Sequence, residues 1–220
     1  MRWPHLKRRS SPQDFGFDLV RFNKNYYSQN GEDGILEEIF TRLNIREGWA
    51  CEFGAWDGKL YSNTFALIER QNWKAVMIEA DKKKFIDLMK TVREQPNIIP
   101  LCKKIHYIDG KGDKLHEVLE STSIPLDMDL LSIDIDSHDY HVWKHLEKYD
   151  PKVVIIECSG LDEEIIQREG AVHKVHYDGS TAFPPLKRLG EEKGYVLVCD
   201  IWNLIFVKKE FINLLKAGAQ

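Results

Sequence analysis

Residues 49 to 81 constrain the fold of this chain more than any other stretch. A short apolar run at 49–53 is followed by Gly54 and, after a tight segment, by Gly58. Ser, Asn and Thr at 62–64 then open a helical stretch, and a second apolar run ends in Glu79. The order strand, glycine turn, helix, strand predicts a βαβ unit, which requires two parallel strands joined by a crossover helix.

The acid at the end of this unit indicates a nucleoside site. Glu79 lies about 20 residues after Gly58, the spacing at which a carboxylate can accept both ribose hydroxyl hydrogens. A pyrophosphate would be repelled by Glu52 and Asp57, whereas the cationic methionine end of S-adenosylmethionine (SAM) would be attracted. The pattern therefore favours SAM over NAD, and the alternative is an ordinary βαβ turn with a solvated acid. The expected cofactor-binding residues are Glu52, Gly54, Ala55, Asp57, Gly58, Asn63, Glu79, Ala80 and Asp81.

The rest of the chain continues the alternation of strands and helices. We expect helices at 28–46, 85–92, 114–120 and 139–149, strands at 97–101, 130–136 and 153–157, and a helix from about residue 182. The runs at 195–199 and 204–207 are too close for a crossover helix, so they predict an antiparallel hairpin. The fold class is therefore α/β. A mostly parallel sheet closed by one antiparallel strand is the arrangement of the Rossmann-like class I methyltransferases, so we expect seven strands in the order 3-2-1-4-5-7-6.

A second chemical stretch lies at 129–140, D-L-L-S-I-D-I-D-S-H-D-Y. Asp134 and Asp136 should share a strand face at the carboxyl end of the sheet, where open α/β sheets bind ligands. They either hold a divalent cation (Mg or Mn) together with Glu157, or supply a general base, or face the methionine moiety. His138 is the best-placed imidazole for proton removal. The alternative without function is that Ser137 and Asp139 cap the helix and Asp134 bonds to loop amides.

Two further polar segments are expected near the ligand. The run at 27–33 is either a ligand contact or a capping segment, and the long loop at 158–181, with His173, His176 and Tyr177, is a candidate substrate lid. Residues 179–181 should cap the helix that follows, with Pro184 in its first turn.

Composition indicates one domain. The 220 residues divide into a basic tail at 1–25, without the apolar stretch of a secretory signal, and a single domain at 26–220. A net charge of −4 and the lack of a long apolar run argue against nucleic acid and membrane partners. Four cysteines without C-x-x-C spacing are typical of reduced thiols in a cytoplasmic protein.

Four motifs together resemble the FkbM-like SAM-dependent methyltransferases. They are S-Q-N-G-E-D-G-I-L at 28–36, E-F-G-A-W-D-G at 52–58 followed by S-N-T at 62–64, I-E-A-D at 78–81, and L-L-S-I-D-I-D-S-H-D-Y at 130–140. The resemblance runs from about residue 26 to 208. It implies a class I fold, SAM as the methyl donor, and often O-methylation of a sugar or natural-product hydroxyl.

The resemblance also implies roles for particular residues. Glu52, Gly54 and Gly58 would line the SAM loop, Glu79 would hold the ribose, and Asp134 and Asp136 would lie at the reaction centre. Ser137-His138 stands where close relatives have Gly-Asn, and Cys158-Ser159 where they have Tyr-Asn. Both departures fall near the expected substrate pocket, so the acceptor does not follow from the family.

Methyl transfer from SAM to a hydroxyl of a small molecule is thus the leading hypothesis. A metal-dependent nucleotide-sugar glycosyltransferase would use Asp134 and Asp136 as a D-x-D motif, but it leaves E-F-G-A-W-D-G unexplained. A third alternative is a non-catalytic interaction protein that keeps the fold, and the acids at Glu79, Asp134 and Asp136 argue against it.

Overall fold

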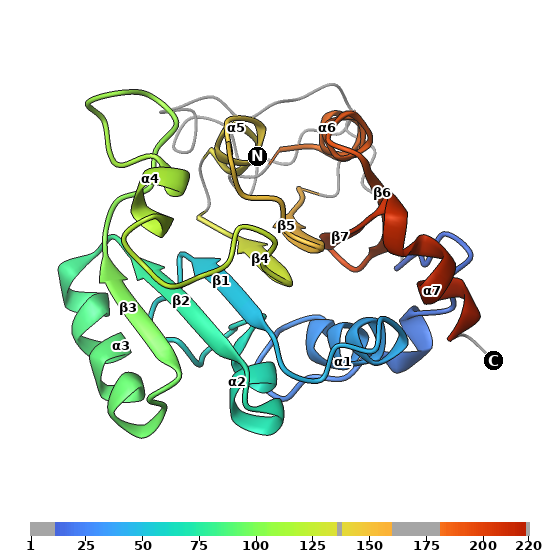
Figure 1. Cartoon of the computed structure of the whole chain (residues 1–220), viewed down its shortest axis with the longest axis horizontal. Helices are drawn as coiled ribbons and strands as arrows, with labels where there is room; N and C mark the ends of the chain where they lie inside the picture. The colour runs from blue at the N-terminus through green and yellow to red at the C-terminus, as the bar shows by residue number, and fades with distance from the viewer. Residues whose placement is uncertain (1–11, 136–137, 160–180, 219–220) are drawn as a thin grey trace, which may run out of the picture.

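A computed structural model describes residues 12–135, 138–159 and 181–218. Their strands form one sheet in the order β3-β2-β1-β4-β5-β7-β6, which confirms the predicted order (Figure 1). The strands are β1 (Trp49–Phe53), β2 (Lys74–Glu79), β3 (Ile98–Cys102), β4 (Leu130–Ile133), β5 (Val153–Glu157), β6 (Tyr195–Asp200) and β7 (Asn203–Lys208).

Parallel pairing runs through the first five strands of the sheet, and β7 pairs antiparallel with both β5 and β6. Only Ile201 and Trp202 separate β6 from β7, so the hairpin expected from the short gap is confirmed. The sheet is therefore mostly parallel and closes with an antiparallel pair.

Helices cover both faces of this sheet (Figure 1). They are α1 (Glu32–Arg42), α2 (Phe65–Gln71), α3 (Lys82–Glu94), α4 (Leu115–Leu119), α5 (Asp139–Lys144), α6 (Phe183–Glu192) and α7 (Ile212–Ala217), with short 3-10 helices η1 (Val20–Phe22) and η2 (Lys209–Phe211). Helices α4, α5 and α6 pack on one face, and α1, α2, α3 and α7 on the other.

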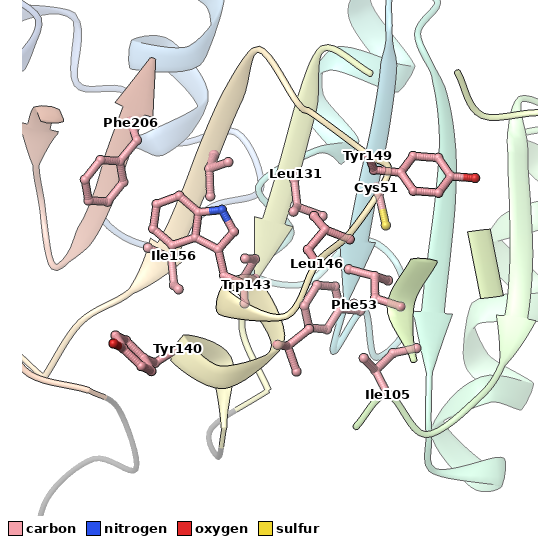
Figure 2. Packing of buried hydrophobic residues seen from close by; sticks show 14 of the residues in the cluster. Cys51, Phe53, Ile105, Leu131, Tyr140, Trp143, Leu146, Tyr149, Ile156 and Phe206 are labelled. Carbon is pink, nitrogen blue, oxygen red and sulfur yellow. The ribbon is translucent and has the colours of Figure 1, made fainter. Parts of the chain in front are cut away.

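Alternation along each strand divides the apolar side chains between two cores. Phe53 of β1 belongs to the core beneath α4, α5 and α6, whereas Ala50 belongs to the opposite core. Trp143 of α5 is fully buried in the first core and packs against Phe206, with ring centroids 5.1 Å apart (Figure 2). Two buried faces explain why the central strands are apolar almost throughout.

Several expected boundaries are wrong by a few residues. The helix expected at 28–46 is bounded by Gly31 and Asn44, which adopt φ +100° and +57°. The helix expected at 139–149 ends at Lys144, with His145 as its C-cap, and Lys148 at φ +64° excludes a helix through to residue 149.

Two further corrections concern the carboxyl end of β4 and the start of α6. The strand expected at 130–136 ends at Ile133, because the Ile135 N–H donates to Asp139 Oδ1 (2.9 Å) instead of a neighbouring strand. Asp139 Oδ1 therefore braces this loop. The N-cap of α6 is Ala182, without a side-chain cap, while buried Thr181 accepts a hydrogen bond through its carbonyl from the Ser159 N–H. Pro184 lies in the first turn of α6, as expected.

The four cysteines are free thiols, three of them buried and Cys102 exposed. Among the described residues, no helix is long and apolar enough to cross a membrane.

Candidate functional site

Two adjoining cavities lie at the carboxyl ends of the parallel strands. The first, of about 280 Å³, is lined by residues that follow β1, β2, β3 and β4, among them Gly54, Glu79 and His138; we call it the β2 cavity. The second, of about 430 Å³, is lined by the ends of β5 and β7 and by loops before α1 and α2; we call it the β5 cavity. Asp134 lines both, so the two cavities meet at this residue.

Gly54 forms the turn between β1 and the rest of the site. Its φ is +84°, and a Cβ at this position would lie 1.8 Å from the carbonyl oxygen of Asp134. The Gly54 and Ala55 N–H groups both donate to the Ile78 carbonyl oxygen, at 3.0 and 3.1 Å. Only glycine fits, because the turn is fixed between the ends of β2 and β4.

Glu79 is held in place by backbone donors at the end of β2. The Trp56 N–H donates to its Oε2 at 2.9 Å and the Asp81 N–H to its Oε1 at 2.7 Å. The side chain is only 6% exposed and lines the β2 cavity together with Ala80. A carboxylate oxygen has two lone-pair sites, so each can still accept a ribose hydroxyl.

Glu52 has a different surrounding from the one expected. Its carboxylate accepts hydrogen bonds from Ser62 Oγ (2.6 Å), the Asn63 N–H (2.9 Å) and Thr64 Oγ1 (2.5 Å). Burial raises the pKa of this carboxyl group, although the three hydrogen bonds oppose the shift. Glu52 does not line either cavity, and its geometry indicates a clamp on the loop before α2 rather than a contact with a cationic ligand.

Asp57 and Gly58 also lie outside the lining of the two cavities. Asp57 Oδ1 accepts the N–H groups of Lys59 and Leu60, which closes a local turn. A Cβ on Gly58 would lie 2.7 Å from Leu88 of α3, so this glycine permits close helix packing. The expected attraction of a cationic donor by Asp57 therefore has no geometric support.

Asp81 and Asn63 complete the expected cofactor set. Asp81 is the N-cap of α3 and accepts hydrogen bonds from the Lys83 and Lys84 N–H groups. These hydrogen bonds lower the pKa of the Asp81 carboxyl group. Asn63 lines the β5 cavity, and its Nδ2 donates to Ser132 Oγ of β4 at 3.2 Å. Asn63 is thus fixed against β4 in the wall of the β5 cavity, which Asp134 also lines.

The expected catalytic residues separate between the cavities. His138 lines the β2 cavity and is buried, with Nε2 donating to the Ile105 carbonyl oxygen at 3.0 Å. Glu157, an expected metal ligand, lines the β5 cavity, and among the described residues only Asp134 lines both cavities. Nε2 of His138 is therefore occupied by a backbone carbonyl, and the residue lines the β2 cavity and not the β5 cavity. Removal of the acceptor proton by His138 stays a prediction.

Part of the predicted site lies outside the described residues. This applies to Asp136 and Ser137, and to His173, His176 and Tyr177 of the expected lid. Within the described positions, no group of three His, Cys, Asp or Glu side chains is arranged to hold a metal ion. Metal binding by Asp134, Asp136 and Glu157 therefore stays a prediction.

Sequence reasoning pointed to the polar run at 27–33 without assigning roles within it. Glu32, at the start of α1, is fully buried and lines the β5 cavity. Its carboxylate accepts hydrogen bonds from the Asn30 N–H (2.7 Å) and from Asn203 Nδ2 (2.8 Å) of β7. The neighbouring Asp33 is a loop brace, because its Oδ2 accepts three consecutive N–H groups at 26–28. The run is thus both a cavity wall and a braced loop before α1, whose N-cap, Gly31, has no side-chain cap.

Tyr61 and Trp202 were missed altogether. Both line the β5 cavity and are substantially exposed. Each is a single aromatic residue in a loop, which carries no periodic signal in the sequence.

Comparisons with known proteins bear on the fold. No protein-family model and no curated protein sequence matches the chain. Among solved structures, the CurJ carbon methyltransferase matches with a TM-score of 0.51 and 9% identity, over 80% of this chain and 52% of that one. The match thus spans about half the length of that protein.

Two further structures match less well. An O-methyltransferase family protein from Burkholderia thailandensis gives a TM-score of 0.47 and 9% identity, covering 80% of this chain and 58% of that one. TrmK of M. capricolum, solved with S-adenosylhomocysteine (SAH), gives a TM-score of 0.47 and 11% identity, covering 78% of this chain and 67% of that one. Neither of these two carries weight here, and the resemblance to the FkbM-like family stays a prediction. Together with the strand order, the CurJ match shows that this chain has the Rossmann-like fold of class I SAM-dependent methyltransferases.

Proposed function

We propose that this protein is a SAM-dependent methyltransferase that acts on a hydroxyl group of a small molecule. The observation that carries the proposal is the junction of the two cavities at Asp134. A buried, pre-oriented Glu79 lies on one side of this junction, and a hydrogen-bonding cavity lies on the other.

The β2 cavity suits the adenosyl part of the donor. Glu79 would accept the ribose hydroxyls, and Gly54 and Ala80 offer backbone and a small side chain close to the ligand. Phe53, Ile78 and Ile135 add apolar lining for a flat base. SAM, when bound, supplies an activated methyl group, so the protein mainly has to align an acceptor oxygen and remove its proton.

The β5 cavity suits the acceptor. Side-chain amides of Gln29, Asn30, Asn63 and Asn203 line it, and these both donate and accept hydrogen bonds. Asp134, which lines both cavities, would accept the hydroxyl proton as a general base. A hydroxyl of a sugar or a similar metabolite fits this lining, and the family resemblance adds weight to that class.

Methyl transfer from labelled SAM to a panel of hydroxylated metabolites tests the proposal. We expect transfer to some members of the panel and calorimetric binding of SAH. Absence of SAM and SAH binding at millimolar ligand would overturn the proposal and leave the fold as an interaction module. Asp134→Asn should abolish transfer while SAH still binds.

The same assay tests the divalent cation expected at Asp134, Asp136 and Glu157. If a cation orients the acceptor, EDTA should stop transfer and added Mg²⁺ or Mn²⁺ should restore it. Full activity in EDTA would show that no divalent cation is needed, and Asp134 would then act as a general base without a metal.

A further inference from the structure

Two aromatic side chains remain exposed at the β5 cavity. Tyr61 is 52% exposed and Trp202 is 43% exposed, and both line the cavity. They come from the loop before α2 and from the β6–β7 turn, which lie far apart in the sequence. Large aromatic rings gain most from burial, so exposed rings at a cavity indicate a surface for a ligand.

The backbone at both positions is unusual. Tyr61 has φ +63° and Trp202 has φ +78°, in the left-handed region that bulky residues rarely adopt. Such conformations persist where the surrounding structure enforces them, and they are concentrated at functional sites.

Hydrogen bonds hold the backbone at both positions, some to distant segments and one within the β6–β7 turn. The Tyr61 N–H donates to the Tyr27 carbonyl oxygen at 3.0 Å. The Trp202 N–H donates to Asp200 Oδ1 at 3.2 Å, and the Cys158 N–H donates to the Trp202 carbonyl oxygen at 3.1 Å. The rings are thus attached to fixed backbone, so little conformational entropy is lost when a ligand stacks on them.

The polar lining restricts which ring can bind. Side-chain amides surround the cavity, and Glu32 is fully buried in its wall. Asn63 and Asn203 each donate one hydrogen bond within the wall, to Ser132 and Glu32, but a side-chain amide can make further donor and acceptor contacts. A flat aromatic acceptor would use little of this remaining capacity, whereas hydroxyl groups can use it. A saturated ring with hydroxyl groups offers a C–H face to the aromatic rings and hydroxyls to the amides.

We propose that Tyr61 and Trp202 form an aromatic subsite that binds a pyranose-type ring of the acceptor. The assignment of the cavity to the acceptor rests on the proposed function; the subsite itself rests on the two rings and the polar wall.

Ligand-observed NMR titration of the SAH-bound full-length protein with methyl pyranosides (glucoside, galactoside, mannoside and rhamnoside) tests the subsite. We expect at least one pyranoside to bind the wild type, and catechol to bind more weakly. Trp202→Ala and Tyr61→Ala should each weaken pyranoside binding at least tenfold and leave the Kd for SAH within about twofold. Trp202→Phe and Tyr61→Phe, which keep a ring, should retain most of the binding.

Phe15→Ala is the matched control. Phe15 is 39% exposed with φ +47°, but it lies outside the lining of both cavities, so its removal should leave pyranoside binding unchanged. If SAH binds but no pyranoside does, or if the Ala variants bind pyranosides like the wild type, the subsite is wrong while the methyltransferase proposal stands. Equal losses in Phe15→Ala, or tighter binding of catechol than of the pyranosides, would also overturn it. Failure of SAH binding would instead contradict the proposed function.

Discussion

Single residues decide whether the turn after β1 can form. Gly54 lies against the Asp134 carbonyl oxygen, so the loop after β4 is positioned by the absence of a side chain at residue 54. The sequence indicated that the backbone at Gly54 must come close to a ligand, and the structure shows that it also comes close to the backbone of Asp134.

Gly54→Ala should therefore be far more damaging than an ordinary glycine substitution. Backbone strain alone costs about 1–2 kcal/mol for a residue in the left-handed region, and the overlap with Asp134 should bring the loss in free energy of unfolding above about 3 kcal/mol. Gly194→Ala is the matched control, because Gly194 has φ +87° with nothing within 4 Å of a Cβ. Urea denaturation of both variants measures the difference, and similar losses would show that the contact with Asp134 is easily relieved.

Glu79 is the residue whose charge should matter most for the donor. Hydrogen bonds to a carboxylate contribute about 1.5–3 kcal/mol each, so Glu79→Ala should raise the Kd for SAH about ten- to a hundredfold. Because Glu79 also accepts hydrogen bonds from two backbone N–H groups, the melting temperature of the Glu79→Ala variant must be measured together with its Kd for SAH. Glu94→Ala removes an exposed acid of α3 that pairs only with Lys59 in the described chain, and it should leave the Kd for SAH unchanged.

The connection between β1 and α2 is the element that depends most on one side chain. Glu52, at the end of β1, accepts hydrogen bonds from three successive residues before α2. These bonds fix Asn63 beside β4, and so connect the strand end to the wall of the β5 cavity.

Burial makes this clamp sensitive to pH. The pKa of Glu52 is raised, so the native state holds the proton more tightly than the unfolded chain does. The resulting stabilisation is present below the ordinary glutamate pKa of about 4.3 and is lost as the pH rises through the raised pKa. We therefore expect the stability of the wild type relative to Glu52→Gln to fall as the pH rises above about 4.3. Urea denaturation at several pH values measures this; a constant or rising difference would show that the hydrogen bonds outweigh burial.

Elements with strong periodicity or fully apolar runs could be predicted from sequence. The run 153–157 and the short gap between β6 and β7 indicated a mostly parallel sheet with a terminal hairpin, and the strand order was expected because class I methyltransferases have this arrangement. Boundaries set by individual hydrogen bonds could not be predicted. The end of β4 depends on Asp139, and the start of α6 on the contact of Thr181 with Ser159.

The site was predictable only in part, for a similar reason. The position of Glu79 at the end of β2 follows from topology, and so does that of Asp134 after β4. The partners of Glu52 depend on how the loop before α2 folds back, and Tyr61 and Trp202 reach one cavity only through tertiary structure.

At the scale of the whole molecule, the proposed donor site joins elements that pack in different cores. The β2 cavity is lined by the ends of β1, β2 and β4, by α3 and by the segment after β3. α3 packs in the core on one face of the sheet, whereas Ile105 belongs to the core on the other face. A ligand in this cavity therefore contacts elements that pack in the cores on both faces of the sheet.

SAH should consequently stabilise the molecule as one cooperative unit. At a concentration one hundred times its Kd, a ligand that binds only the native state adds about 2.7 kcal/mol. For a chain of this length, that corresponds to an increase in melting temperature of about 5–10 °C, with a single transition. Glu79→Ala at the same SAH concentration should show a shift that is smaller by about half or more, because the Kd of this variant is higher. Calorimetric melting curves with and without SAH test this, and a second transition that SAH leaves unmoved would show that the two cores unfold independently.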